Sequence, residues 1–588
     1  MILIVQKQKN KKEFEMNKLV TNKIIGILCL LLIVSIHSLA QIDPGKDFDL
    51  QGFIDQELVK GKKEIHIPAG RYRVKPNGNK HLLLKNLKDV TILANGVELI
   101  CTETVQAINI INCKNLTIKG LSVDYDPLPF TQGRIVAMSN DKTKLTVDII
   151  DGYSTKLRNE KLEIYDPETG ELVTRTYYAV TYKVDEANRR VVFSKKPQAN
   201  ETYSFEEIGD IIVFDSYNTR QAPHAIVMED CEKLTLENVQ VFAGPTFAFF
   251  EKRCNASRYI GCKVDRRPLE NEIVKRGVMR MRSNNADGFH SKSAQVGPSY
   301  RNCITRYNGD DGFAISGNYH VITEANGNLL TVVGKAGFTP DIFVGDVVEL
   351  VSYDGTRLPD ATVLSIKADR PLNVTEKNFL GTQKLLRESA NTKDAANVYI
   401  IEIDQRVELP MGSVIASANR LGNGFEVINC IAGPNRSRGI IVKGSNGTIA
   451  NNRCISNWGM GIKCSPEHQW LEAGSGKNLT IINNIIENCG DAAIAVYAIG
   501  GNGKTASTGA HSNITISDNK VSGSLSPAFV VTSTDGLIFM NNKVESPTIK
   551  ALDPSRIQFG RKEDPRRHVY LENVEKVKEN FGLTNSNK

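Results

Sequence analysis

The sequence has little or nothing of several features that mark common protein classes. Its 588 residues include only two tryptophans and nine histidines. No two cysteines have the C-x-x-C spacing and no His/Cys cluster has the spacing of a zinc site, so no structural metal is expected. No stripe of Lys and Arg interleaved with aromatic residues supports a nucleic-acid partner. Hydrophobic residues make up 41% and charged residues 24%, which is the composition of an ordinary folded protein.

Long apolar runs are also scarce, and the clearest one lies near the N-terminus. Two lysines precede the apolar run 24–36, and Ser38-Leu39-Ala40 then offers small residues at the positions that a signal peptidase reads. The run is shorter than the ~20 apolar residues that a membrane span needs. We therefore expect residues 1–40 to be a cleaved signal peptide, with Met16 the more natural start, in a secreted or periplasmic protein without a membrane span.

Short strand-like units recur along the rest of the chain. Each has alternating branched apolar residues, as in the segments 87–92, 115–118, 233–236, 478–481 and 513–516. The units are too short for helical repeats and rich in β-branched residues, and Asn, Gly and Asp stand at the bends. Hairpin signals, which a β-sandwich would need, are sparse in these stretches. The repeat therefore predicts an all-β fold, a right-handed parallel β-helix.

Asparagine and cysteine occupy recurring places in the repeat. Asparagine pairs at 451–452, 483–484 and 541–542 suit solenoid turns, because Asn tolerates left-handed backbone angles and can form ladders between coils. Ten cysteines remain after loss of the leader, and the repeat places eight of them at similar points: Cys113, Cys231, Cys254, Cys262, Cys303, Cys430, Cys454 and Cys489. We predict a stacked column of buried thiols, with disulfides as the alternative in an exported protein.

Two stretches interrupt the repeat with hairpin-like sequence. Both 132–221 and 318–422 are expected to be small antiparallel β-barrels inserted into the solenoid. The tail 551–588 is charged and is expected to cap the last coil. The β-helix itself then comprises the segments 41–131, 222–317 and 423–550.

Three aspartates form the sharpest chemical feature. Asp287 lies in the stretch SNNADGFHSK, and the pair Asp310-Asp311 follows 23 positions later, about one solenoid turn. Stacked coils lie roughly 4.8 Å apart, so the three carboxyl groups should converge on one outer face. Crowded carboxylates repel, which raises at least one pKa and places an acid beside a base. The alternatives are that the Asp-Gly pairs are simple turns or that the acids bind calcium.

These motifs resemble those of known β-helical enzymes. Asn285-Ala286-Asp287, Asp310-Asp311 and the Arg438 to Lys443 segment are similar to the polygalacturonase signatures, although the Gly-His-Gly element is missing. The chain more closely resembles glycoside hydrolase family 110, through VDYDPLPFTQG (Val123 to Gly133), NADGFHSK, NGDDGFAIS and the two insertions. That resemblance implies a cofactor-free exo-α-1,3-galactosidase, of the Bacteroides type of Gram-negative bacteria, acting on glycans with terminal α-galactose, including blood-group B.

The resemblance also implies roles for individual residues. Asp310 would be the general acid, while Asp287 and Asp311 would position and deprotonate the attacking water. Inversion of the anomeric carbon would require the acid and base to lie about 6.5 to 9.5 Å apart. The predicted sugar-binding residues, each with a structural role as the alternative, are His290, Arg438, Lys443, Glu467, Trp470 and Glu472.

Two other functions stay open from the sequence. A polyuronide hydrolase or lyase would need cations to meet substrate carboxylates. Loss of the leader removes six lysines and two glutamates, so the formal charge falls from +7 to +3, which argues mildly against that substrate. A non-catalytic glycan-binding β-helix would use the aspartates for turns or calcium. The sequence does not indicate an oligomeric state.

Overall fold

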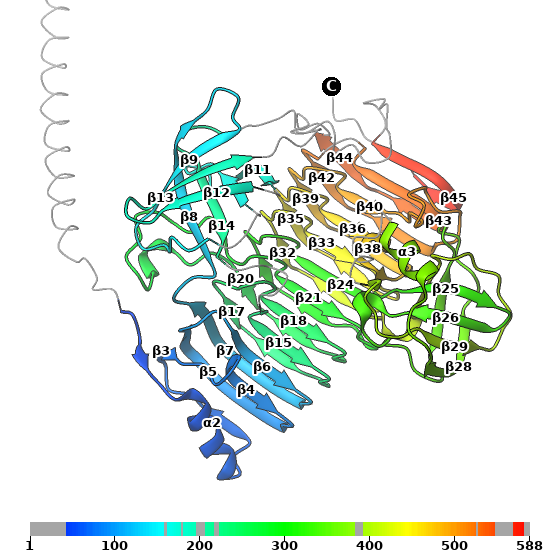
Figure 1. Cartoon of the computed structure of the whole chain (residues 1–588), viewed down its shortest axis with the longest axis horizontal. Coiled ribbons are helices and arrows are strands. Elements are labelled where there is room, and N and C mark those ends of the chain that lie inside the picture. Colours follow the sequence, from blue (N-terminus) through cyan, green and yellow to red (C-terminus); the bar gives the residue numbers. More distant parts are fainter. Residues whose placement is uncertain are drawn as a thin grey trace, which may run out of the picture.

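A computed structural model describes residues 43–157, 162–177, 180–195, 206–216, 223–382, 392–524, 527–546 and 568–580. The described chain is a parallel β-helix with two inserted domains (Figure 1). The predicted signal peptide at 1–40 lies outside the described residues. Within the described part of the chain, no helix has the length and apolar character needed to cross a membrane.

Each coil of the solenoid contributes one strand to each of three parallel stacks. The first stack, on which the site is built, consists of β4 (Lys80–Lys85), β6 (Gln106–Ile111), β15 (Ile226–Glu229), β18 (Phe249–Lys252), β21 (Phe289–Lys292), β24 (Phe313–Asn318), β33 (Ile440–Val442), β36 (Ile462–Cys464), β40 (Ile494–Val496), β43 (Phe529–Met540) and β45 (Val569–Glu579).

The other two stacks complete the coil. The second contains β2 (Glu64–His66), β5 (Lys88–Cys101), β7 (Lys114–Tyr125), β16 (Thr235–Glu237), β19 (Arg258–Ile260), β22 (Ser299–Arg301), β31 (Glu426–Ile428), β34 (Thr448–Ala450), β38 (Lys477–Ile482) and β41 (His511–Ser517). The third contains β1 (Lys46–Asp47), β3 (Gly70–Val74), the later halves of β5 and β7, β17 (Gln240–Val241), β20 (Lys263–Val264), β23 (Ile304–Thr305), β32 (Ile431–Ala432), β35 (Arg453–Ile455), β39 (Ile485–Glu487), β42 (Lys520–Ser522) and β44 (Lys543–Ser546).

Alternation along each strand sends every second side chain into the solenoid, where equivalent residues stack. Phe249, Phe289 and Phe313 lie one above the other, with ring centroids 4.6 and 5.0 Å apart. Burial of such columns supplies the main stabilisation, because a single coil cannot cover its own apolar face. The residues between them, such as His290, face outward and are available to a site.

The asparagine ladder is confirmed. Asn452, Asn484, Asn519 and Asn542 are buried and linked by side-chain amide hydrogen bonds of 3.0, 3.0 and 2.9 Å. The residue before each of them has a left-handed φ: Asn451 at 57°, Asn483 at 56°, Asp518 at 56° and Asn541 at 55°. Each ladder amide also donates to a carbonyl of a neighbouring coil, so the ladder fixes the coil register.

The ten described cysteines are free and buried, as predicted, but they do not form one column. Cys113, Cys231 and Cys254 follow the first stack, and the amide of Cys113 donates to the Cys231 sulfur at 3.3 Å. Other cysteines lie at the turn that leads into the third stack. There the backbone amide of Cys430 donates a hydrogen bond to the side-chain oxygen of Asn452 at 2.8 Å, which connects this cysteine to the asparagine ladder. The separation arises because each coil has more than one turn with room for a small buried side chain.

The first insertion is a seven-stranded antiparallel sheet. Its strand order is β11 (Leu172–Tyr177), β10 (Leu162–Tyr165), β14 (Ile211–Asp215), β8 (Phe130–Met138), β9 (Lys144–Ile149), β13 (Arg190–Lys195) and β12 (Val180–Asp185). The edge strands β11 and β12 follow each other in the chain. The insertion leaves the solenoid after β7 and returns before β15.

The second insertion is a closed six-stranded barrel, which confirms the predicted architecture. Its order is β25 (His320–Asn326), β26 (Leu329–Val333), β29 (Tyr399–Ile403), β28 (Ala361–Ala368), β27 (Val347–Val351) and β30 (Val414–Ser417). Helix α3 (Val374–Thr382) lies between β28 and β29 in the chain. Figure 1 shows the barrel in green to the right of the stacked coils and the first insertion in cyan to the left.

The two ends of the solenoid are covered differently. Helix α2 (Leu50–Val59) packs on β2 and β4 at the first coils, and its N-cap Asp49 accepts a hydrogen bond from the Gly52 amide. At the other end, the described part of 551–588 is the strand β45. Residues of β45 pair in parallel with β43 and add another rung, because they retain the alternating pattern of a strand.

Candidate active site

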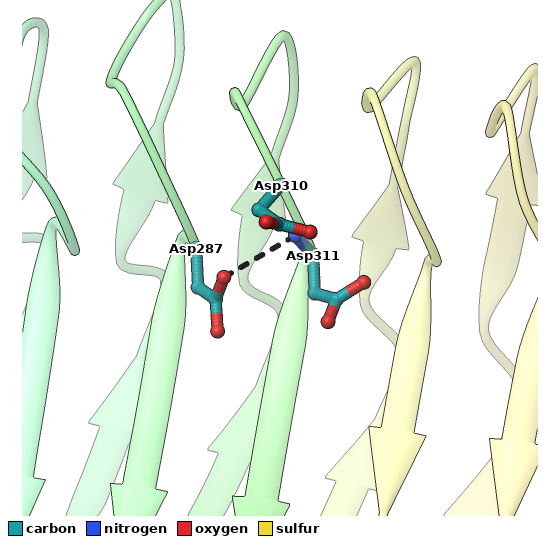
Figure 2. A group of neighbouring side chains, drawn as sticks. All are labelled: Asp287, Asp310 and Asp311. Carbon is teal, nitrogen blue, oxygen red and sulfur yellow. Dashed lines mark hydrogen bonds between the residues drawn. The ribbon is translucent and has the colours of Figure 1, made fainter. Parts of the chain in front are cut away.

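The three aspartates converge at the start of two neighbouring strands. Asp287 stands two residues before β21, and Asp311 stands two residues before β24. The Gly288 amide donates to the Asp311 carbonyl at 2.9 Å, which locks the two coils in register. One carboxylate oxygen of each residue lies within 4.8 Å of the others, with Asp310 beside Asp311 on the same coil (Figure 2). The predicted convergence is confirmed.

The surroundings of the three carboxyl groups differ. Asp311 is 4% exposed and forms a two-pronged pair with Arg438, with Nη2 to Oδ2 at 2.6 Å and Nε to Oδ1 at 2.8 Å. Asp287 is 5% exposed and lies 2.7 Å from His290 Nδ1. The Asp310 side chain is 38% exposed, and its Oδ2 lies 3.4 Å from Arg436 Nη1. Asp310 is therefore the carboxyl group that an incoming molecule reaches first.

Among the three aspartates, Asp287 is the one whose carboxyl pKa is raised. Burial, and then the charges of Asp311 and Asp310, raise the pKa of Asp287 well above its usual range. Burial and the Lys292 charge lower the pKa of His290 well below its usual range, so this neighbour is neutral. Two arginines accompany the other two acids, which leaves Asp287 as the carboxyl group that most readily holds a proton before substrate binds.

The carboxylates lie closer together than we expected. Oxygens within 4.8 Å are nearer than the about 6.5 to 9.5 Å separation typical of inverting glycosidases. Stacking explains the difference, because residues at equivalent positions of adjacent coils are held at the strand spacing of about 4.8 Å. The distance alone does not favour inversion.

Four of the six predicted sugar-binding residues form an ion-pair network beside the aspartates. Lys443 Nζ lies 3.1 Å from Glu467 and 2.7 Å from Glu472, and Arg438 Nη1 lies 3.4 Å from Glu467. Burial raises the pKa of Glu467, but the Lys443 and Lys463 charges outweigh it, and the net pKa lies well below the usual range. Arg438 and Lys443 were predicted to meet sugar hydroxyls, and the structure shows both engaged with acids.

The other two predicted residues have separate places. His290 is 5% exposed and stacks on Phe247, with ring centroids 4.5 Å apart. Its Nε2 has no hydrogen-bond partner among the described residues. Trp470 belongs to the short 3-10 helix η4 (His468–Trp470) and is half-buried. It is absent from the described lining of the pocket beside the network.

Comparisons with known proteins agree with this architecture. A family model described as "Right handed beta helix region" matches residues 411–544. The chain is 24% identical over 425 residues to alpha-1,3-galactosidase B of Bacteroides thetaiotaomicron, covering 68% of this chain and 64% of the relative. It is 23% identical over 456 residues to alpha-1,3-galactosidase A of Shewanella woodyi, covering 73% and 69%. The chain is thus similar in sequence to two α-1,3-galactosidases.

These matches confirm the resemblance to glycoside hydrolase family 110 that the motifs predict. The match to the Bacteroides protein spans less than two thirds of that relative's length. Among solved structures, an exopolygalacturonase from Thermotoga maritima is 9% identical with a TM-score of 0.38, covering 92% of this chain and 89% of that chain.

Sequence reasoning missed Arg436 and its partner. Arg436 is 6% exposed, and its Nε lies 3.3 Å from Glu163 of β10 in the first insertion. Arg282 also contacts Glu163 at 2.9 Å. Arg436 therefore bridges the inserted sheet and Asp310. No local signal marks this bridge, because its members lie far apart in the sequence.

An aromatic row next to Asp287 was also missed. His224, Phe247, Asp287, Asp311 and Arg438 each stand two residues before a strand of the first stack. The rings of His224 and Phe247 stack with centroids 4.5 Å apart, and Phe247 in turn stacks on His290. Aligning the coils on their strand starts would have revealed this row. Half-exposed aromatic faces beside acids suit a pyranose ring.

A pocket of about 890 Å³ opens next to the ion-pair network. Arg438, Lys463 and Glu467 form the wall nearest the aspartates. Tyr497 and Tyr570 belong to later coils on the C-terminal side. The carboxylates thus have an aromatic row on their N-terminal side and a polar pocket on their C-terminal side.

Proposed function

We propose that the protein is a secreted or periplasmic glycoside hydrolase that removes terminal α-1,3-linked galactose from glycans, both branched blood-group B structures and linear Galα1,3Gal. The observation that carries this proposal is the convergence of Asp287, Asp310 and Asp311 on the outer face of the β-helix, within 4.8 Å of one another. The names of the two relatives support the linkage and the sugar.

The charge balance of the site favours a neutral sugar over a polyuronide. The cations nearest the aspartates already have anionic partners: Arg438 pairs with Asp311, Lys463 with Glu467, and Lys443 and Lys292 with Glu472. A substrate carboxylate would have to compete with these buried acids for the same cations. Hydroxyl groups can instead donate to the carboxylates and accept from the cations without breaking the pairs.

The proposed reaction is an inverting hydrolysis. Asp310, the exposed acid, donates its proton to the glycosidic oxygen as the bond from that oxygen to C1 breaks. A water held between Asp287 and Asp311 attacks C1 from the opposite face, and its proton passes to one of these carboxylates. The products are β-galactose and a glycan with a new hydroxyl. The Asp287 proton must first move within the cluster, through a water that bridges oxygens lying within 4.8 Å of one another.

Retention is the second candidate, because close carboxylates are typical of double displacement, in which a carboxylate attacks C1 directly. Proton NMR of the newly released sugar distinguishes the two: β-galactose appears first under inversion and α-galactose first under retention.

The same experiment tests the whole proposal. The protein is incubated separately with blood-group B trisaccharide, Galα1,3Gal and polygalacturonate, and the anomeric protons are followed. Galactose release from the first two is the expected result. Absence of release from both galactosides contradicts the proposal, and cleavage of polygalacturonate would establish the polyuronide alternative. Should all three stay intact, calcium titration and glycan binding would test the non-catalytic alternative.

A further inference from the structure

The pocket beside the ion-pair network extends well past the carboxylates. From β24 the first stack continues through β33, β36, β40 and β43 to β45. These are five strand spacings of about 4.8 Å, or about 24 Å in all. Arg438 stands at the near end of the pocket, and Tyr570 and Glu572 of β45 stand at the far end.

The far end is built from fixed polar groups. Glu572 Oε2 accepts hydrogen bonds from Thr505 Oγ1 at 3.1 Å and from the Tyr570 hydroxyl at 2.9 Å. The loop that carries Thr505 is anchored to the barrel, because the Asn502 amide donates to the Tyr353 carbonyl at 3.2 Å. The side chains are therefore held in place before any ligand arrives, which lowers the entropic cost of binding.

The chemistry of the lining suits sugars. Tyr570 is partly exposed and offers a ring to the apolar face of a pyranose, whereas Tyr497 is 4% exposed and lies behind the lining, with Lys463 5.1 Å from its ring centroid. Lys504 lines the same pocket and makes no ion pair with the residues that the structure describes, so its ammonium group can donate to hydroxyl oxygens.

We propose that this pocket binds the leaving-group side of an extended oligosaccharide, holding the sugars that follow the terminal galactose. This inference rests on the proposed exo-galactosidase function, in which only one side of the cleaved bond carries several sugars. A volume of about 890 Å³ falls near the upper end of the 300–1,000 Å³ typical of small-molecule sites, which is more than one terminal galactose requires. The pocket therefore matches the leaving-group side of the substrate, which carries several sugars, better than the single terminal galactose.

The test compares two substrates with the same terminal pair, the disaccharide Galα1,3Gal and a linear tetrasaccharide ending in it. In the wild-type protein, kcat/KM should be higher for the tetrasaccharide, because remote binding is used in the transition state. Lys504→Ala and Tyr570→Ala should each lower the tetrasaccharide-to-disaccharide ratio of kcat/KM about threefold to tenfold, the effect of one lost hydrogen bond or ring contact. Thermal melting checks that both variants fold.

Lys520→Ala is the matched control, because Lys520 is an exposed lysine of β42 in the third stack and should leave the ratio unchanged. Equal kcat/KM for the two substrates in the wild type, or a ratio that survives both pocket substitutions, overturns the inference while the proposed function stands. If neither galactoside is cleaved, the proposed function fails. The trisaccharide product is then titrated by calorimetry: binding that Lys504→Ala weakens supports the pocket, and no binding to the wild type overturns it.

Discussion

The three aspartates of the site are chemically identical, but the charged and polar neighbours of their carboxyl groups differ. Arg438 clamps Asp311, Arg436 stands beside Asp310, and a neutral histidine faces Asp287. The convergence of these acids was predictable from their spacing of one coil. Their individual charge environments were not, because Arg436 and Arg438 enter the site only after the barrel returns the chain to the solenoid.

Asp310→Asn tests the general acid. Activity on Galα1,3Gal should fall about 10² to 10⁴-fold, since the leaving oxygen loses its proton donor. An aryl α-galactoside with a strongly acidic phenol as leaving group needs no such donor and should lose much less. Steady-state rates for both substrates measure the effect, with the exposed Asp369→Asn as control. An equal loss on both substrates would contradict the assignment, and the same pattern in Asp287→Asn would move the acid role to the residue with the raised pKa.

Arg436 should set the pH range of the reaction. Its guanidinium, 3.4 Å from Asp310, favours the ionised carboxylate, so Arg436→Gln should favour the protonated acid and move the alkaline limb of the kcat profile to higher pH. Arg436→Lys retains the charge and should move it less. A uniform loss of rate at every pH, without displacement of the limb, would indicate that Arg436 is merely structural.

Asp287 should reduce stability at neutral pH. Its folded-state pKa is raised, so its contribution is most favourable below the ordinary carboxyl range and is lost as pH rises through the folded value. Asp287→Asn should therefore raise the melting temperature at pH 7 to 8, with the gain shrinking toward pH 4. Calorimetry across this range gives the answer, and a gain that is constant with pH would be evidence against it.

At the scale of elements, what could be predicted followed from local pattern. Alternating β-branched residues and Asn bends identified the coils. The hairpin-like sequence of the second insertion predicted the closed barrel that the structure contains. The strand order of the first insertion and the Glu163–Arg436 bridge depend on contacts between distant segments, and no periodicity encodes them. The final rung β45 was overlooked because its charged exposed positions obscure the alternation.

The asparagine ladder should be a strong stabiliser of the coil register. Asn484 is fully buried, donates to the Ile449 carbonyl at 3.0 Å and shares amide hydrogen bonds with the coils on both sides. Asn484→Ala leaves several polar groups unpaired and should lower the free energy of unfolding by about 1–3 kcal/mol. Urea titration compares it with Asn378→Ala on the exposed side of α3. Equal midpoints for the two variants would show that the ladder is not needed.

At the scale of the whole molecule, each of the two insertions contributes contacts to the site that the repeat does not provide. One supplies Glu163 behind Asp310 through Arg436, and the other anchors the loop that carries Thr505 at the pocket. The repeat alone predicts where the carboxylates meet, whereas the insertions hold Arg436 and the Thr505 loop in place beside them.

The buried thiols should make the folded protein inert to alkylation. Burial raises the pKa of Cys464 and of Cys489 to about 12, so little thiolate is present at neutral pH. The ten described cysteines should react with a maleimide only after denaturation, and reductant should leave the melting temperature unchanged. Mass spectrometry counts the labels. Disulfides detected before reduction would contradict the free-thiol arrangement.

The pair between Asp311 and Arg438 joins residues 127 positions apart, with the entire barrel between them. Closing so long a loop carries an entropic cost and delays the contact relative to local pairing between successive coils. During refolding, the spectroscopic signal of the β-strands should therefore recover before Asp311 pairs with Arg438. Competence for chemistry would then be among the last properties that the chain gains, after the barrel has brought the two coils together.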